Sequence, residues 1–535
     1  MRFIIPSLLA LSLSACYTTQ QTESDLTLNP VHYLTVLHTN DHHGRFWHNE
    51  DGEYGMAARK TLIDKLRAEA NAQGHSLVLL SGGDINTGVP ESDLQHAEPD
   101  FKGMSLLGYD AMAIGNHEFD NPLDVLDKQI AWSNFPLLSA NILHKHSGEH
   151  AYQAYTIIEK QGLKIAVIGL TTIDTVKIAN PEFVGGLDFV EPAPITAQLS
   201  QRIRQQYNPD VTIAVTHMGH YHDAAYGINA PGDVTLARNV PAGTLDMIIG
   251  GHSQEPICID ENGEEDPDFA PGKACKPDQQ NGVWIMQAHE WGKYVGKAVF
   301  RISGNEKTLE SYELIPVNLK DEQGQWAHDY IEHDPELKAF LAPYQKTGES
   351  KIAGAVGEVD AFLDGRRDTV RFRQSPLGDL VIKAQMAAVG ADFGLISGGG
   401  IRASIKAGEV SYKDILTVHP FRNRITYIDW TGQELIDYMS VVSMFPPDSG
   451  AYLQYHGIEF DIHDGKLTNV KIQGELVDPN KTYRMSINSY NAAGGDGYPV
   501  LTDLPGYTAT DSTDAQVLRD FIERHSPIKL STLSD

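Results

Sequence analysis

Positive charge is scarce in this chain of 535 residues, where 42 lysines and arginines stand against 71 aspartates and glutamates. The net charge of −29 argues against a nucleic-acid polymer as partner, because gripping a phosphate backbone requires a basic surface. Long apolar runs are also lacking, and after the amino terminus no segment is apolar enough to span a membrane. Disorder and fibres are excluded, since 41% hydrophobic and 21% charged residues are ordinary for a globular protein. The length predicts two or more domains.

The amino terminus has the composition of an export signal. Met1-Arg2 carries one positive charge, and a short, largely apolar run follows. Leu-Ser-Ala-Cys at 13–16 resembles a bacterial lipobox, which implies a signal peptide over 1–15, cleavage before Cys16 and attachment of lipid to its thiol. The alternative is a plain secretory signal followed by an incidental cysteine.

The segment 16–30 is polar and is interpreted as a flexible tether. Tyr17 stands where an aspartate would retain a lipoprotein at the inner membrane. We therefore expect a lipoprotein anchored to the bacterial outer membrane, with its folded part in the periplasm or on the cell surface.

Two further cysteines, Cys258 and Cys275, complete the total of three. In the oxidising compartment that export implies, we expect them to form a disulfide, which contributes about 3 kcal/mol through chain entropy. The alternative is two free thiols in a surface loop. The acidic segment between them lacks the ligand spacing of an EF-hand and is interpreted as solvated surface.

Short β-branched runs recur between residues 33 and 303, separated by turns or by helical stretches such as 56–72 and 192–206. Continuous apolar strands with intervening helices predict a layered α/β domain over 31–330, with its sheets buried. In such folds the carboxyl ends of the strands carry the ligand site.

The segment 331–351 predicts a linker helix that ends near Gly348. From residue 352 strand-like and helical runs alternate with glycine-rich turns, and a second domain is predicted over 352–525. The sequence contains no internal repeat and no low-complexity tract.

Metal-binding side chains follow five of the predicted strands, each beside a glycine. They are Asp41 and His43, Asp84, Asn116 and His117, His217, and His252 and Gln254. Each motif alone has an ordinary explanation, such as a turn, a cap or a hydrogen-bonded histidine, but five in order indicate a metal centre. Imidazole and carboxylate suit zinc, manganese or similar ions. Phosphatases hold two such ions about 3.5–4 Å apart, and Asp84 is the carboxylate expected to bridge them.

These motifs resemble those of the calcineurin-like metallophosphoesterases. SGGGIR (397–402), HPFRN (419–423) and GGDGYP (494–499) narrow the resemblance to the bacterial 5'-nucleotidase/UDP-sugar hydrolase family. The resemblance covers nearly the whole chain. It implies an α/β protein with an N-terminal four-layer α/β/β/α metallophosphoesterase domain and a smaller C-terminal α/β nucleotide-binding domain.

The resemblance also implies two divalent metal ions, with zinc, manganese, magnesium and cobalt as candidates. It places Asp41, His43, Asp84 and Gln254 around one ion, and Asp84, Asn116, His217 and His252 around the other. Gln254 stands where many members of the superfamily have a second histidine. An amide oxygen is a weaker ligand, so we expect the first ion to exchange more easily.

His117 is expected to stabilise the transition state, and Asp120 to raise its pKa and fix its tautomer. The alternative is that the two residues merely cap the next helix.

The predicted second domain carries arginines and aromatic residues in place of a metal set. A guanidinium binds phosphate through paired hydrogen bonds, and aromatic faces stack on nucleobases. The resemblance implies that arginines hold the anionic part of the substrate, two rings enclose the base, an asparagine touches the base and an aspartate holds the ribose hydroxyls. The arginines are Arg367, Arg371 and Arg402, the two rings are those of Phe421 and Tyr490, the asparagine is Asn423 and the aspartate is Asp496.

The resulting prediction is a monomeric 5'-nucleotidase of nucleotide salvage. It would hydrolyse nucleoside 5'-mono-, di- and triphosphates, with UDP-sugars as a further class, by two-metal attack of hydroxide, giving nucleoside and phosphate. Members of the family rotate the second domain, which makes the linker a predicted hinge. The alternatives are a 2',3'-cyclic-nucleotide phosphodiesterase/3'-nucleotidase of the same fold and a non-catalytic nucleotide-binding surface protein.

Overall fold

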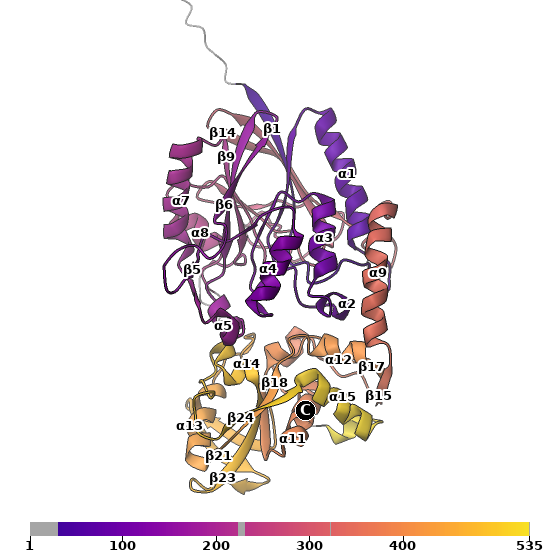
Figure 1. Cartoon of the computed structure of the whole chain (residues 1–535), viewed down its shortest axis with the longest axis vertical. Coiled ribbons are helices and arrows are strands. Elements are labelled where there is room, and N and C mark those ends of the chain that lie inside the picture. Colours follow the sequence, from indigo (N-terminus) through magenta and orange to yellow (C-terminus); the bar gives the residue numbers. More distant parts are fainter. Residues whose placement is uncertain (1–29, 223–229, 322, 534–535) are drawn as a thin grey trace, which may run out of the picture.

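Two six-stranded sheets form the centre of the first domain in the computed structural model, which describes residues 30–222, 230–321 and 323–533 (Figure 1). The first sheet has the order β14-β13-β1-β2-β3-β4 and comprises β1 (Val31–Thr39), β2 (Ser76–Ser81), β3 (Ala111–Ala113), β4 (Leu137–Leu138), β13 (Tyr294–Ser303) and β14 (Glu306–Pro316). The second has the order β11-β12-β10-β9-β7-β6 and comprises β6 (Tyr155–Lys160), β7 (Leu163–Thr171), β9 (Val211–His217), β10 (Met247–Ile249), β11 (Asp278–Gln280) and β12 (Val283–Met286).

Alternate side chains of these strands enter different cores. In β1, Leu34 and Val36 join the apolar cluster between the two sheets, whereas Leu37 packs under helices. In β9, Val215 joins the same central cluster and Ala214 faces the opposite way. The helices on the first sheet are α1 (Met56–Ala72), α3 (Glu98–Leu107) and α4 (Leu123–Trp132), and those on the second are α7 (Pro192–Tyr207) and α8 (Asp233–Asn239). The predicted four-layer α/β/β/α arrangement is confirmed.

Shorter elements connect these layers. They are α2 (Pro90–Asp93), the 3-10 helix η1 (His117–Phe119), α5 (Thr175–Ile178), α6 (Pro181–Val184) and the two-stranded sheet of β5 (Ile142–His144) and β8 (Leu187–Phe189). The predicted disulfide joins Cys258 and Cys275 after β10.

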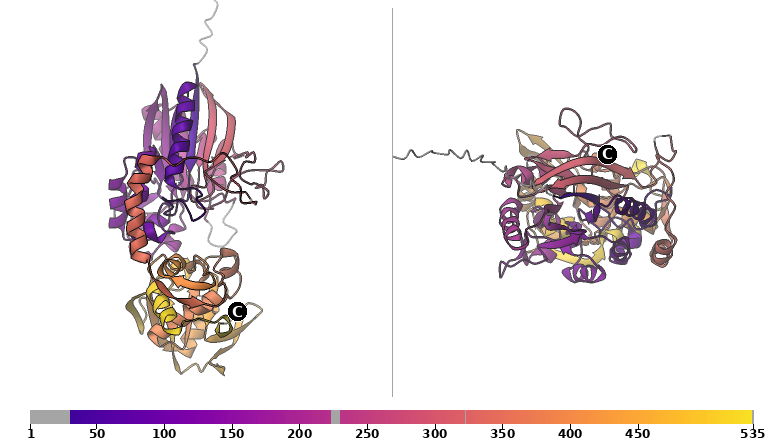
Figure 2. Two further views of the ribbon diagram at one scale, coloured as in Figure 1. Left: turned by 90° about the vertical axis from the view of Figure 1, so that its right-hand side faces the viewer. Right: turned by 90° about the horizontal axis from the view of Figure 1, so that it is seen from above.

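Helix α9 (Pro335–Ile352) runs along the side of the first domain and leads into the second (Figures 1 and 2). The Asp334 carboxylate caps it by accepting a hydrogen bond from the Leu337 amide at 2.7 Å. The helix continues through Gly348, so the prediction that it ends there is wrong. A Cβ at Gly348 would lie 2.6 Å from Cα of Glu91 on α2. The glycine therefore serves close helix packing and not termination.

The second domain is built on a five-stranded sheet of order β19-β16-β23-β18-β24. Its strands are β16 (Phe393–Ser397), β18 (Arg424–Thr431), β19 (Leu453–His456), β23 (Thr482–Asn488) and β24 (Tyr507–Thr513). Its helices are α10 (Arg367–Val370), α11 (Pro376–Val389), α12 (Tyr412–Val418), α13 (Gly432–Val442), α14 (Ser489–Ala492) and α15 (Asp514–His525), with the 3-10 helices η2 (Gly398–Gly400), η3 (Gly495–Gly497) and η4 (Leu530–Thr532). Smaller sheets pair β15 (Ala355–Val359) with β17 (Gly408–Ser411), and β20 (Ile458–His463) with β21 (Lys466–Ile472) and β22 (Glu475–Leu476).

Within the described ranges no helix is both long and apolar enough to cross a bilayer. The predicted signal peptide, tether and lipidated Cys16 lie outside the described residues.

Candidate active site

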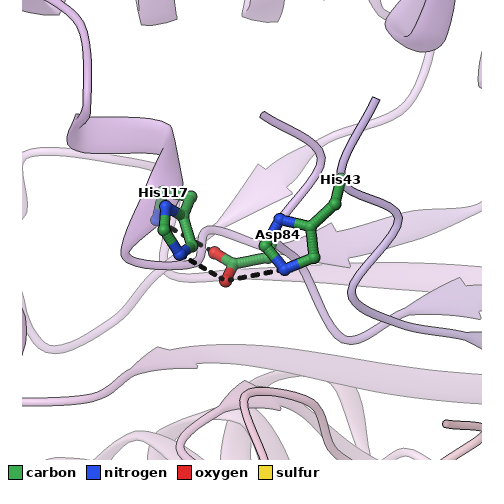
Figure 3. Close-up of side chains that lie close together, drawn as sticks. All are labelled: His43, Asp84 and His117. Atoms are coloured by element: carbon green, nitrogen blue, oxygen red, sulfur yellow. Dashed lines mark hydrogen bonds and ion pairs between the residues drawn. The ribbon is translucent and has the colours of Figure 1, made fainter. Parts of the chain in front are cut away.

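The predicted metal ligands meet where strands of both sheets end. In the first sheet β1, β2 and β3 are parallel neighbours, and in the second β9 and β10 are. Their carboxyl ends therefore share one edge of the sandwich. Two groups place their donor atoms within 4.8 Å of one another: His43, Asp84 and His117, and Asp84, His217 and His252. Asp84 belongs to both groups, and Figure 3 shows its carboxylate between His43 and His117.

Asp84 is the centre of this cluster. Its Oδ2 lies 2.8 Å from Nε2 of His217, 3.9 Å from Nε2 of His43 and 4.0 Å from Nε2 of His117. Although burial opposes a charged imidazole, Asp84 raises the pKa of His217 to about 10. A Cβ at Gly115 would lie 2.1 Å from Oδ1 of Asp84, so only glycine leaves room for the carboxylate there.

Asp41 completes the carboxylate set behind the cavity. Its side chain accepts hydrogen bonds from the His252 amide at 2.9 Å and from the Asn40 side chain at 2.7 Å, and its Oδ1 lies 3.9 Å from Nε2 of His43. Burial first, and then the charge of Asp84, raises the pKa of Asp41 to about 7. Two buried carboxylates whose charges repel are unfavourable in their ionised forms unless a cation lies between them.

The histidine tautomers and one amide fit divalent ions. Nδ1 of His43 donates to the Thr87 carbonyl and Nδ1 of His217 donates to the Gly82 carbonyl, both at 2.7 Å. In the neutral ring each bond leaves the Nε2 lone pair facing the cluster, as metal-binding histidines require. Oδ1 of Asn116 is buried and has no hydrogen-bond partner among the described residues. This donor set of imidazole, carboxylate and amide oxygen suits zinc, manganese and related ions.

Gln254 is placed differently from the rest. Its amide nitrogen lies 2.9 Å from Nε2 of His43, so it faces the lone pair that an ion would use. A ligand role requires the amide to turn and present its oxygen. The backbone at this position is left-handed, a strained conformation that also occurs at Asp41, His43, Asp84 and His252.

His117 and Asp120 form a closely coupled pair. Nδ1 of His117 donates to Oδ2 of Asp120 at 2.5 Å, and the Thr87 hydroxyl donates to the same oxygen at 2.6 Å. Burial alone would lower the pKa of His117, but the carboxylates of Asp120 and Asp84 raise it to about 9. Asp120 therefore orients the imidazole and favours its charged form, a pairing that a mere capping role does not require.

Two residues that hold the predicted site residues in place were missed by the sequence prediction. The Thr87 hydroxyl fixes the carboxylate of Asp120 by a hydrogen bond. The Glu118 carboxylate accepts hydrogen bonds from the backbone amides of Ile85 and Gly115, each at 2.7 Å, and so holds the loop that carries Asp84. Glu118 directly follows the predicted pair Asn116 and His117 in the sequence, which was the available signal. Thr87 could have been suspected from its position three residues after Asp84.

A cavity of about 740 Å³ opens between the metal cluster and the second domain. Asp41 and His217 lie behind its wall, whereas the other predicted ligands reach its lining. Every residue predicted to bind substrate also lines it: Arg367, Arg371, Arg402, Phe421, Asn423, Tyr490 and Asp496.

One ring of the second domain reaches the predicted catalytic residue His117 directly, and an arginine lies beside that ring. The Phe421 ring lies parallel to that of His117 with centroids 6.0 Å apart, and Cζ of Arg402 lies 5.6 Å from the Phe421 centroid. Burial, followed by the charges of Arg367 and Arg402, lowers the pKa of Arg371 to about 9. Such crowded guanidinium groups favour an anionic ligand.

The residues predicted to contact the base and the ribose are held by local contacts. The Tyr490 hydroxyl donates to the Lys177 carbonyl on α5 at 3.2 Å, which joins the two domains. The Asn423 carbonyl accepts the Asp514 amide at 2.8 Å. Asp496 has a left-handed backbone, and burial raises its pKa.

Family models match both halves of the chain. Residues 34–256 match the calcineurin-like phosphoesterase model, and residues 354–503 match the 5'-nucleotidase C-terminal domain. A 5'-nucleotidase of Vibrio vulnificus is 55% identical over 97% of this chain and 95% of its own length. This chain belongs to the 5'-nucleotidase family. It is an enzyme of the UshA type, a metal-dependent hydrolase with the metallophosphoesterase fold.

Two further relatives of this 5'-nucleotidase-family enzyme cover nearly its whole length. Protein UshA of Escherichia coli is 52% identical over 98% of this chain and 96% of its own. The structure of a 5'-nucleotidase precursor from Thermus thermophilus superposes with a TM-score of 0.74 and 26% identity, over 92% of this chain and 96% of that one.

Proposed function

We propose that this enzyme hydrolyses nucleoside 5'-mono-, di- and triphosphates, and UDP-sugars as a further class, releasing phosphate and nucleoside from the monophosphates. One observation carries the proposal: a single cavity is lined by the metal cluster on one side and by the arginine and aromatic set on the other. A phosphate at the cluster and a base near Phe421 and Tyr490 would span it.

In this proposal Asp41, His43, Asp84 and Gln254 hold one divalent ion, and Asp84, Asn116, His217 and His252 hold the other. When bound, the two ions neutralise phosphate charge and favour hydroxide as the nucleophile. Water loses a proton, and its oxygen forms a bond to the terminal phosphorus while the bond from that phosphorus to its leaving oxygen breaks; the leaving oxygen is the 5' oxygen in a monophosphate and the bridging oxygen in a di- or triphosphate. The His117 imidazolium stabilises the phosphoryl oxygens or protonates the leaving oxygen, and Asp120 and Thr87 hold its Nδ1 side. Arg367, Arg371 and Arg402 orient the anion.

The test is phosphate release by metal-stripped protein after addition of single divalent ions. The substrates are 5'-AMP, ATP, UDP-glucose, 3'-AMP and 2',3'-cyclic AMP. Metal-dependent hydrolysis of 5'-AMP and ATP is expected. Activity on the 3' and cyclic substrates alone would replace the proposal by the cyclic phosphodiesterase function. Inactivity with every ion and substrate would favour a nucleotide-binding surface protein.

Domain movement is proposed to admit the substrate and release the product. Two polar contacts lie beside the end of α9: Lys413 on α12 pairs with Glu91 on α2 at 2.7 Å, and Lys351 donates to the Leu94 carbonyl at 3.2 Å. These contacts lie where α9 enters the second domain, which supports a hinge there. A disulfide engineered across the domain gap is expected to abolish turnover, and full turnover of the locked form would contradict the proposal.

The amino terminus is proposed to anchor a monomer to the outer membrane through lipid on Cys16. Mass spectrometry of the mature amino-terminal peptide should find a diacylglyceryl cysteine, and Cys16→Ser should move the protein to the soluble fraction. An unmodified Cys16 in a soluble wild-type protein would favour the plain secretory signal.

A further inference from the structure

Arg45 is an arginine of the first domain that has no role in the catalytic mechanism proposed above. It follows His43 in the loop between β1 and α1, and it lines the cavity. Its Nη1 donates to the His43 carbonyl, and its Cζ lies 4.0 Å from the ring centroid of Trp291. Among the residues described by the structure no carboxylate lies within ion-pair distance of it, and Glu290 and Asp93 act on its charge from farther away. Several of its N–H groups are therefore available to a ligand.

The Arg45 guanidinium is held in position from several sides. The Trp291 amide donates to the Asp41 carbonyl at 2.6 Å, which ties the indole to the metal cluster. A Cβ at Gly88 would lie 2.4 Å from Nη1 of Arg45, so this glycine makes room for the group. A planar cation stacked on an indole and bonded to a backbone carbonyl loses little further entropy when it binds an anion.

A second guanidinium lines the same cavity from the other domain. Arg402 follows the glycine turn at 398–400, and in the described part of the chain no carboxylate lies within ion-pair distance of it, although the charges of Asp120 and Asp496 act on it. Burial lowers the pKa of Arg45; Tyr54, Glu290 and Asp93 raise it, and the charge of Arg402 lowers it again. Arg45 and Arg402 both line the cavity, one from each domain. Like charges in a partly buried cavity are unfavourable unless an anion lies between them.

We propose that Arg45 and Arg402 bind a phosphate other than the one being hydrolysed, so that Arg45 favours nucleoside di- and triphosphates over monophosphates. The inference rests on the proposed function. A monophosphate places its single phosphate at the metal cluster, whereas ATP brings two more that must fit between the cluster and the base. The centroid of the Phe421 ring lies 6.0 Å from that of the His117 ring, so the straight line from the metal cluster to the base is too short for two additional phosphates. The additional phosphates then turn toward Arg45 and Arg402.

The test compares kcat/KM for ATP, ADP and AMP in the full-length wild-type enzyme and in Arg45→Met. A charge-assisted hydrogen bond to phosphate makes the expected fall in the ATP-to-AMP ratio on the order of tenfold or more. Arg45→Lys keeps the charge without the planar fork and is expected to give an intermediate ratio. It also decides the question if Arg45→Met does not fold.

Lys293→Met is the matched control. The Lys293 ammonium lies 4.4 Å from the same indole centroid, pairs with Glu290 at 2.8 Å and is absent from the cavity lining. Its removal deletes one charge next to Trp291 and should leave the ratio unchanged. An equal loss on AMP and ATP in the Arg45 variants would overturn the inference, because Arg45 would then only support His43. A wild-type enzyme inactive on all three nucleotides would instead overturn the proposed function.

Discussion

The stability of the first domain should depend on pH through His220. This side chain is buried three residues after His217 and bridges two acidic groups. Its Nδ1 lies 2.7 Å from Oε1 of Glu265, inside the disulfide loop, and its Nε2 lies 3.0 Å from Oδ2 of Asp278 on β11. The imidazolium therefore fastens the disulfide loop to the edge of the second sheet.

The magnitude follows from the shift in its pKa. Burial alone would lower the pKa of His220, but its bonds to Asp278 and Glu265 raise it from 6.5 to about 9. At about 1.4 kcal/mol per pKa unit, the charged bridge stabilises the fold by about 3 kcal/mol. Because the pKa is higher in the folded state, this contribution is present in full below about pH 6.5 and is lost as the pH rises through about 9.

The perturbation is His220→Gln, which keeps a polar side chain but cannot carry the charge. Hydrogen exchange should report the free energy of local opening for β9, β11 and β12 at about pH 6 and at about pH 9.5. We expect the wild-type advantage to be about 3 kcal/mol larger at the lower pH. The difference between the wild type and Asp278→Asn should depend on pH in nearly the same way as the difference between the wild type and His220→Gln. A difference between wild type and variant that is independent of pH would refute the electrostatic reasoning and leave packing as its source.

Three further changes test other parts of the structure. Asp84→Asn removes the charge shared by both donor groups, so elemental analysis should find less bound divalent metal and kcat should fall on the order of a thousandfold; full metal content would contradict the bridging role. Replacing Cys258 and Cys275 by serine should cost about 3 kcal/mol, seen as a lower Tm that matches the reduced wild type; equal melting of oxidised wild type and variant would exclude that contribution. Lys413→Met leaves the buried Glu91 carboxylate without its cation, so X-ray scattering should record a larger radius of gyration without substrate; an unchanged radius would show that other contacts hold the domains.

Much of the fold could be predicted because apolar periodicity reports burial directly. The strand of residues 31–39 alternates between two cores, and the polar residues after such strands predicted the metal cluster at their carboxyl ends. Only the resemblance pointed to the candidate substrate residues of the second domain, since arginines and aromatic rings alone are equally typical of surface and core.

Local sequence could not decide features that depend on a distant neighbour. By local sequence Gly348 indicates the end of a helix. Its role in close packing depends on Glu91, which is far away in the chain and packs against it. The Gln254 amide nitrogen faces His43, an orientation that depends on a contact between the two sheets. The pairing of Thr87 with Asp120 likewise needs two loops to be brought together.

The sequence by itself determined the layered α/β architecture, the donor types of the metal cluster and their order, because these depend on residue identity and short-range periodicity. Only the tertiary structure decided which charged groups lie close to one another. It placed Arg45 and Arg402 on the lining of one cavity between the two domains, and it placed His220 between Glu265 and Asp278. The physical reason is that electrostatic interactions and close packing depend on distance in space, which chain separation does not reveal.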